Sequence, residues 1–132
     1  MTIEQRMDQL DKRNKRLTVA KTIFVMNNAG FPIVSMSATD AGNGIFRTSS
    51  AKGKGLVELN STEGGGGSVT TYQPNGKKLV RLGATVGGNS GAIDVFNKTG
   101  EGIAQMMADE YGNGVVGAYN RKGKGRTLKP GP

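Results

Sequence analysis

The sequence predicts an all-β fibrous repeat, a trimeric β-helix or β-prism shaft with repeats of about 23 residues, preceded by a short N-terminal coiled-coil helix. Three observations predict this class: two recurring columns of glycine, alternating apolar and polar residues between them, and a shortage of large apolar residues. Only 27 of the 132 residues are Leu, Ile, Val or Phe, whereas 22 are Gly. Because one such chain buries little apolar area against its conformational entropy, we expect copies of the chain to share a core.

Residues 1–20 are expected to form an N-terminal helix that joins a short trimeric coiled coil. Its apolar residues recur at alternating spacings of 4 and 3, the period of a heptad seam. One polar residue, Asn14, occupies the seam, where it would fix the register and the number of helices. A single amphipathic helix lying on the β body is the alternative. The predicted seam consists of Ile3, Met7, Leu10, Asn14 and Leu17.

Residues 21–120 are expected to form a glycine-punctuated β-repeat shaft. Both glycine columns slip by one residue together between Gly76 and Gly91 and then recover, which indicates a true repeat. Glycine supplies the positive φ angles that tight turns require, so both columns are interpreted as turn glycines. The first column is Gly30, Gly53, Gly76, Gly100 and Gly123, and the second is Gly44, Gly67, Gly91 and Gly114.

Each repeat is predicted to contain two short strands and two turns. After Gly76, Val80 and Leu82 fall on one face of a strand and Arg81 on the other. We expect the apolar faces of three chains to meet on a common axis. The strand residues predicted for this trimer core are Val34, Met36, Val57, Leu59, Val80, Leu82 and Met106.

The formal charge of +8 is concentrated at the two ends of the chain. Residues 1–21 have a net charge of +3, residues 22–110 are neutral, and residues 111–132 have a net charge of +5. Residues 121–132 are expected to form a basic, irregular C-terminal tail that contains Gly and Pro. This tail is the candidate for a weak anion contact, through Arg121, Lys122, Lys124 and Arg126.

The composition excludes several classes of function. Without Cys or His, the chain has no disulfide frame, thiol nucleophile, zinc ribbon, imidazole base or Ser-His-Asp triad. We therefore expect no enzyme activity, no metal ion and no cofactor. No apolar run approaches the roughly 20 residues of a membrane span, and no signal peptide is visible, so no membrane span is expected.

The segments Val95–Ala104 and Asp109–Val116 show the repeat most fully, and their pattern resembles two groups of trimeric fibrous β-repeat proteins. One group is the shafts and needles of phage tail fibres and injection spikes; the other is bacterial surface repeat proteins. The resemblance covers residues 23–128 and implies a location in a virion, an extracellular assembly or the cell surface. The membrane helix of the second group and the His-rich iron-binding tip of some spikes are missing here.

The sequence therefore leads us to expect a non-enzymatic homotrimer that forms a rigid fibre or spike shaft in a virion, injection device or surface filament. Its expected partners are copies of itself and further assembly partners at the ends. Two alternatives stay open. One is a monomeric β-solenoid that polymerises end to end as a scaffold, and the other is a module that binds nucleic acid or acidic polysaccharide through its basic ends.

Overall fold

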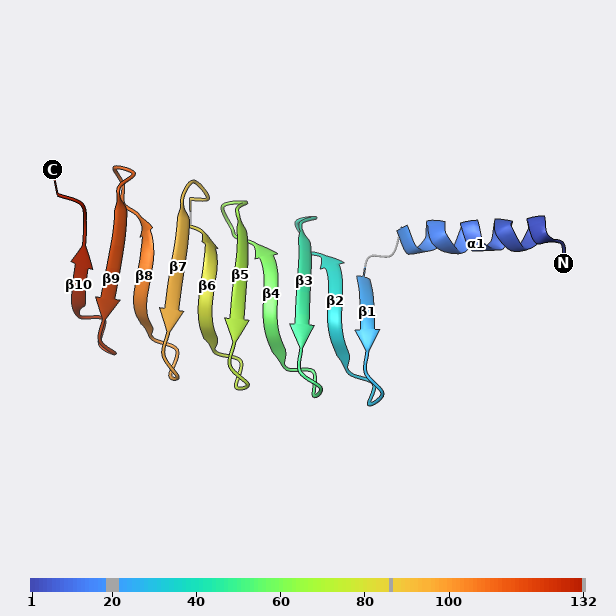
Figure 1. The fold of residues 1–132 in the computed structure, drawn as a ribbon, viewed down its shortest axis with the longest axis horizontal. Coiled ribbons are helices and arrows are strands. Elements are labelled where there is room, and N and C mark those ends of the chain that lie inside the picture. Colours follow the sequence, from blue (N-terminus) through green and yellow to red (C-terminus); the bar gives the residue numbers. More distant parts are fainter. Residues whose placement is uncertain (19–21, 86, 132) are drawn as a thin grey trace.

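The computed structural model describes residues 1–18, 22–85 and 87–131, and within the helix it describes the side chains of residues 3–10 and 12. The described residues form one helix and one sheet of ten strands (Figure 1). The elements are α1 (Ile3–Thr18), β1 (Thr22–Met26), β2 (Pro32–Ala38), β3 (Gly44–Ser49), β4 (Gly55–Ser61), β5 (Gly67–Tyr72), β6 (Lys78–Ala84), β7 (Gly91–Phe96), β8 (Gly102–Ala108), β9 (Gly114–Tyr119) and β10 (Gly125–Leu128).

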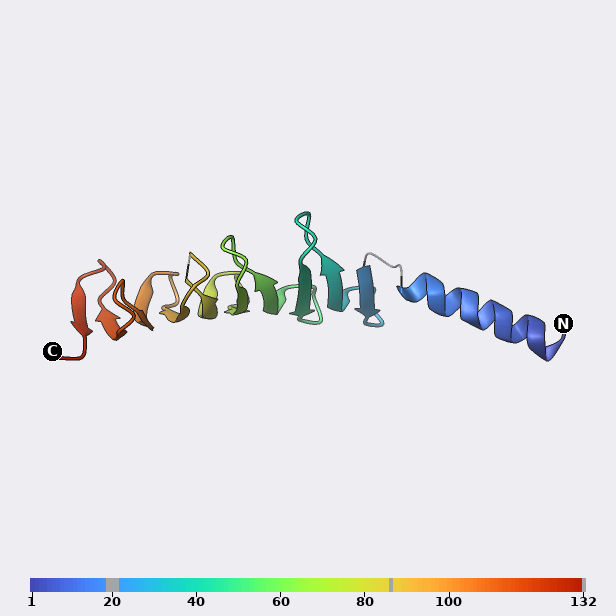
Figure 2. The ribbon, with the colours of Figure 1, turned by 90° about the horizontal axis from the view of Figure 1, so that it is seen from above.

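The sheet is an antiparallel meander in which each strand pairs with its neighbours in the sequence. The strands lie across the long axis of the molecule, so the backbone hydrogen bonds between them run along that axis (Figure 1). Seen from above, the sheet is one layer thick, and α1 extends beyond β1 at one end (Figure 2). The predicted all-β repeat with a short N-terminal helix is confirmed.

The helix begins with a capping box, in which two side chains satisfy backbone N–H groups of the first turn. The hydroxyl of Thr2 accepts from the backbone N–H of Gln5 at 3.2 Å, and the side-chain oxygen of Gln5 accepts from the N–H of Thr2 at 2.9 Å. The helix then lies within residues 1–20, where the heptad spacing predicts it.

The strands are joined by turns that alternate between two long edges of the sheet, called here the lower and the upper turns from their positions in Figure 1. Each turn closes when its first residue donates its N–H to the carbonyl of its last residue. The lower turns are residues 27–31, 50–54, 73–77, 97–101 and 120–124, and the upper turns are residues 39–43, 62–66, 85–90 and 109–113.

The first turn shows why these residues form tight hairpins. The side-chain oxygen of Asn27 accepts from the N–H groups of Ala29 and Phe31, and Gly30 adopts a φ of +81°. This is a type I turn followed by a left-handed glycine, a common three-residue hairpin loop. Ser50, Asn97, Asp109 and Asn120 accept backbone N–H groups in the same way in their own turns.

The structure confirms one glycine column and corrects the other. All five glycines of the first column have a positive φ, between +75° and +95°. The second column was wrongly interpreted as turn glycines, because Gly44, Gly67, Gly91 and Gly114 begin strands β3, β5, β7 and β9. The left-handed position is always the fourth residue of the turn. In the upper turns it is occupied by Gly42, Gly65, Gly88 and Gly112.

Two further features noted in the sequence, the one-residue insertion and the C-terminal tail, can be compared with the structure. The one-residue insertion lies in the upper turn 85–90, which has six residues where the other turns have five. The expected irregular tail at 121–132 is wrong in part, because residues 120–124 form the last lower turn and β10 continues the sheet to Leu128. Asn120 caps this turn as Asn27 caps the first, so the repeat extends further than its apolar columns indicated.

Candidate functional site

The most continuous chemical feature of the molecule is a row of apolar side chains that crosses the whole sheet. Each strand contributes one residue, and each residue is directly opposite the next in the strand pairing. Because opposite residues of an antiparallel pair lie on the same face, the row marks one face of the sheet. We call the row the apolar ladder and its side of the sheet the apolar face. Its members are Ile23, Met36, Phe46, Leu59, Val69, Leu82, Ile93, Met106, Val116 and Leu128.

A second row on the same face runs parallel to the apolar ladder, two residues along each strand. It contains valines on five strands and ends in Ala104, Ala118 and Arg126 at the C-terminal end. All seven strand residues that the sequence predicts for the core lie in these two rows. Six further members of the apolar ladder were not predicted as core residues: Ile23, Phe46, Val69, Ile93, Val116 and Leu128. The same alternation marks them, and a cross-strand alignment of the two strands in each repeat would have found them.

The apolar face has no cover within the described chain. Leu82 is 50% exposed and Met106 is 52% exposed, although each lies in the middle of its strand. The chain exposes 9960 Å² in total, whereas a compact monomer of this mass exposes about 6,600 Å². The excess is of the size that obligate protein–protein interfaces bury.

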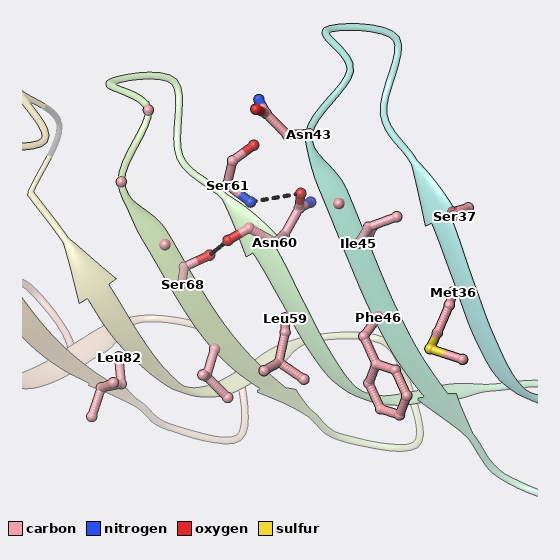
Figure 3. Close-up of a pocket in the computed structure, with 15 residues that line it drawn as sticks. Met36, Ser37, Asn43, Ile45, Phe46, Leu59, Asn60, Ser61, Ser68 and Leu82 are labelled. Carbon is pink, nitrogen blue, oxygen red and sulfur yellow. Dashed lines mark hydrogen bonds between the residues drawn. The ribbon is translucent and has the colours of Figure 1, made fainter. Parts of the chain in front are cut away.

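A hollow on this face lies over β2 to β6 and has a volume of about 680 Å³. Met36, Phe46, Leu59 and Leu82 line it side by side (Figure 3). Glycines of the turn 62–66 and the start of β5 form its rim, and Ser and Asn side chains line it beside the apolar residues. It is a shallow trough that continues the apolar ladder, and it contains no convergent set of catalytic groups.

The helix offers a second exposed apolar surface at the end of the molecule. Ile3, Met7 and Leu10, the first three members of the predicted seam, are all exposed. The side chains of Asn14 and Leu17 lie outside the described residues, so their part of the predicted seam is not placed.

The opposite face, called here the polar face, satisfies its groups within the chain. Arg47 pairs with Glu58 across β3 and β4 at 2.9 Å, and Arg81 pairs with Asp94 across β6 and β7 at 2.9 Å. Thr70 lies between these two ion pairs and is buried. No buried side-chain nitrogen or oxygen lacks a hydrogen-bond partner among the described residues.

The shifted pKa values have structural causes. Backbone N–H groups of Asn113 and Tyr111 donate to Asp109 and lower its pKa, while hydrogen bonds from Thr99 and Asn97 lower the pKa of Glu101. Burial is the main cause that raises the pKa of Tyr72, and the nearby Glu58 adds to it. These groups cap turns or pack on the polar face, so their shifts indicate turn and packing roles.

The four residues predicted for an anion contact are brought together at the C-terminal end. Arg121, Lys122 and Lys124 belong to the last lower turn, and Arg126 lies on β10, directly opposite Ala118 on the apolar face. All four are exposed. Among the described residues, no three of Asp, Glu, His and Cys gather as a metal ion requires, and no helix is long and apolar enough to cross a membrane.

Comparisons with known proteins do not identify a family. No family model matches the chain, and no curated protein matches it. One similar solved structure is that of a mutant of S. aureus TarM in complex with fondaparinux, alpha-GlcNAc-glycerol and UDP, with a TM-score of 0.42 and 12% sequence identity. The match covers 92% of this chain and 24% of that chain. A likeness this distant gives no information on function.

Proposed function

We propose that this protein is a non-enzymatic homotrimer that forms a rigid fibre or spike shaft. The observation that supports the proposal best is the apolar ladder, which is unbroken from β1 to β10 and has seven of its ten residues exposed in a single chain. Burying one Leu, Met or Ile side chain stabilises a fold by about 1.5–3 kcal/mol. A row of ten such residues is therefore a strong reason for copies of the chain to associate.

The proposed number of three chains in the assembly rests on the sequence. A short heptad seam with one polar member, followed by a thin apolar stripe on glycine-punctuated strands, resembles the trimeric shafts of phage fibres and needles. In such an arrangement the three apolar ladders face a common axis, and the seam residues Ile3, Met7 and Leu10 lie at the helical end.

The fold supports a mechanical role for such an assembly. The strands lie across the long axis, so a pull along the shaft loads the backbone hydrogen bonds of many strand pairs in series. The sheet is about 48 Å long at a strand spacing of about 4.8 Å. A shaft of this kind would transmit force and hold an end group at a distance.

End-to-end growth as a scaffold is supported less well than a closed trimer. The edge strand β10 has only four residues and is followed by Lys129 and Pro130, which are poor partners for a further strand. At the other edge, α1 extends beyond β1 (Figure 2). A meander also leaves its apolar face open, whereas a single-chain solenoid turns that face inward.

Light scattering coupled to size exclusion, across a range of concentrations, tests the proposal. We expect a constant mass of three times the chain mass of 13.8 kDa, with elution early for that mass. In the same assay Leu82→Asp, which places three charges on the axis, should abolish the trimer. A mass of 13.8 kDa for the unaltered chain, or a folded Leu82→Asp trimer with an unchanged melting temperature, would contradict the shared core.

A further inference from the structure

The charged residues of the turns are sorted between the two edges of the sheet. The upper turns contain four acidic residues and no basic residue: Asp40, Glu63, Asp109 and Glu110. The lower turns contain one acidic residue, Glu101, and seven basic residues: Lys52, Lys54, Lys77, Lys98, Arg121, Lys122 and Lys124. A segment that is neutral by sum, residues 22–110, therefore has one acidic and one basic edge.

These edge charges are not balanced within one chain. The ion pairs of the described residues are Lys12–Asp8 on the helix and the two pairs of the polar face, and none involves a turn residue. A strand of six or seven residues separates the edges by roughly 20 Å, whereas salt screens charges beyond about 8–10 Å. Local contacts are few: Arg121 lowers the pKa of Glu101, and Lys129, beyond β10, lowers that of Asp109, each as the last of several causes.

From this segregation we infer that copies of the chain run parallel around a shared long axis, with the acidic upper turns of one copy beside the basic lower turns of the next. The inference rests on the proposed trimer and adds its orientation and its contacts. The docking partner is a second copy of this chain, recognised through its apolar face and the opposite charge of its edge.

Symmetry explains why the charge pattern selects this arrangement. Rotation about an axis parallel to the shaft, with the apolar faces inward, brings the lower edge of each copy to the upper edge of its neighbour, a heterologous contact that closes into a ring. An antiparallel pair, packed through the same faces, brings like edges together and places acid against acid. Only the parallel ring is complementary in charge.

The charges also match in position along the shaft. The most acidic upper turn, residues 109–113, lies between the lower turns 97–101 and 120–124, and the latter is the most basic. Glu63 belongs to the turn between the lower turns with Lys52 and Lys77. The first lower turn, residues 27–31, has no charged residue, and neither does the longer upper turn 85–90.

Cysteine crosslinking tests the arrangement directly, because the natural chain has no Cys. The variants are Lys98→Cys on the lower edge, Glu110→Cys on the upper edge, and the double variant, each treated with a short thiol-specific crosslinker. We expect the double variant to give covalent dimers and trimers on a denaturing gel. Each single variant should stay monomeric on that gel, because like edges lie apart.

Mass measurement on the same samples separates the two proposals. A trimeric mass together with self-crosslinking of either single variant would overturn the parallel ring and leave the trimer standing. A monomeric mass before crosslinking would overturn both.

Charge reversal provides a second measurement that does not depend on thiol geometry. Glu63→Lys with Glu110→Lys should lower the melting temperature of the trimer by a few degrees at low salt, and so should Lys52→Glu with Lys98→Glu. The four changes together give neighbouring edges opposite charges again, so we expect them to recover most of the lost melting temperature. High salt should reduce all the differences in melting temperature. Additive losses in the fourfold variant would contradict the contact between unlike edges.

Discussion

Leu82 and Arg81 are neighbours on β6, yet they point to opposite faces and have opposite surroundings. Arg81 donates to Asp94 at 2.9 Å and to the carbonyl of Ala84 at 2.6 Å, so its charge is paired within one chain. Leu82 is half exposed, with no layer of the described chain above it. The ion pairs of the polar face form within one chain, whereas the apolar face is uncovered in the described chain, and we propose that other copies cover it.

Burial follows the same division. The most buried side chains of the described residues are Thr70, Ala92 and Val115, and the strand pairing places all three on the polar face. On the other face, seven of the ten residues of the apolar ladder are exposed, among them Leu59, Leu82 and Met106. In a single chain the most buried residues therefore lie on the polar face while most of the apolar ladder is exposed, and the following predictions test this difference between the faces.

The largest effect is expected when the same charged residue is placed on each face of one strand. Met36→Asp puts a carboxylate into the apolar ladder and should abolish the trimeric mass, since burying unpaired charges costs several kcal/mol. Ser35→Asp is the matched control, because residue 35 is next in the chain, lies on the polar face and is directly opposite Arg47. Light scattering should show a trimer for Ser35→Asp. If the two variants had the same mass by light scattering, the two faces would not differ in their role in assembly.

A smaller effect is expected at a pair of glycines that differ in backbone conformation. Gly65 has a φ of +83°, so Gly65→Ala should destabilise the fold by about 1–3 kcal/mol. Gly67 begins β5 without a positive φ, and a Cβ there meets nothing within 4 Å in its own chain. Gly67→Ala should therefore change the free energy of unfolding by less than about 0.5 kcal/mol in thermal melts. A large loss at Gly67 would show that another copy approaches the backbone at this end of the strand.

The ion pairs of the polar face should contribute less to stability than either the apolar ladder or the left-handed glycines. Arg81→Gln is expected to destabilise the fold by about 0.5–1 kcal/mol and to leave the trimeric mass unchanged, because the pair is partly exposed. A double-mutant cycle with Asp94→Asn, read by denaturant unfolding, measures the coupling. Loss of the trimer in Arg81→Gln would mean that the polar face also takes part in assembly.

The smallest effect concerns pH. The pKa values of Asp109 and Glu101 lie below those of the unfolded chain, so their stabilisation is present above the unfolded value of about 4 and is lost as the pH falls through the lower, folded value. Asp109→Asn keeps an oxygen that can accept the two turn hydrogen bonds and should flatten this acid dependence in melts at pH 2 to 5. An unchanged acid profile in this variant would assign the dependence to other groups.

The repeat, its lower turns and the core residues of one strand in each repeat could be predicted from the sequence, because each depends on local spacing. Gly30 and its column mark a backbone requirement, and the alternation of Val80, Arg81 and Leu82 fixes which face each occupies. The second glycine column was misread because Gly44 has the spacing of a turn residue without the positive φ.

The charged edges were missed because charge was summed along the chain. Residues 22–110 have equal numbers of basic and acidic residues, yet the hairpins send alternate turns to opposite sides of the sheet. Glu63 and Lys77 are close in sequence but belong to different edges. The strand pairing, which sequence spacing alone does not give, was needed to separate them.

Eight of the nine turns described have five residues, so the length of this molecule can change by whole repeats while its two ends stay the same. Removing residues 46–68, one repeat of 23 residues, would join Ile45 to Val69, which would take the place of Phe46 in the apolar ladder. The sheet would be shorter by two strands, about 9.6 Å. The helix, the last hairpin and the order of acidic and basic turns would all be retained. The reach of such a molecule can be changed by duplication or deletion of whole repeats, and this deletion would remove only interactions internal to the lost repeat and its borders, such as the ion pair between Arg47 and Glu58.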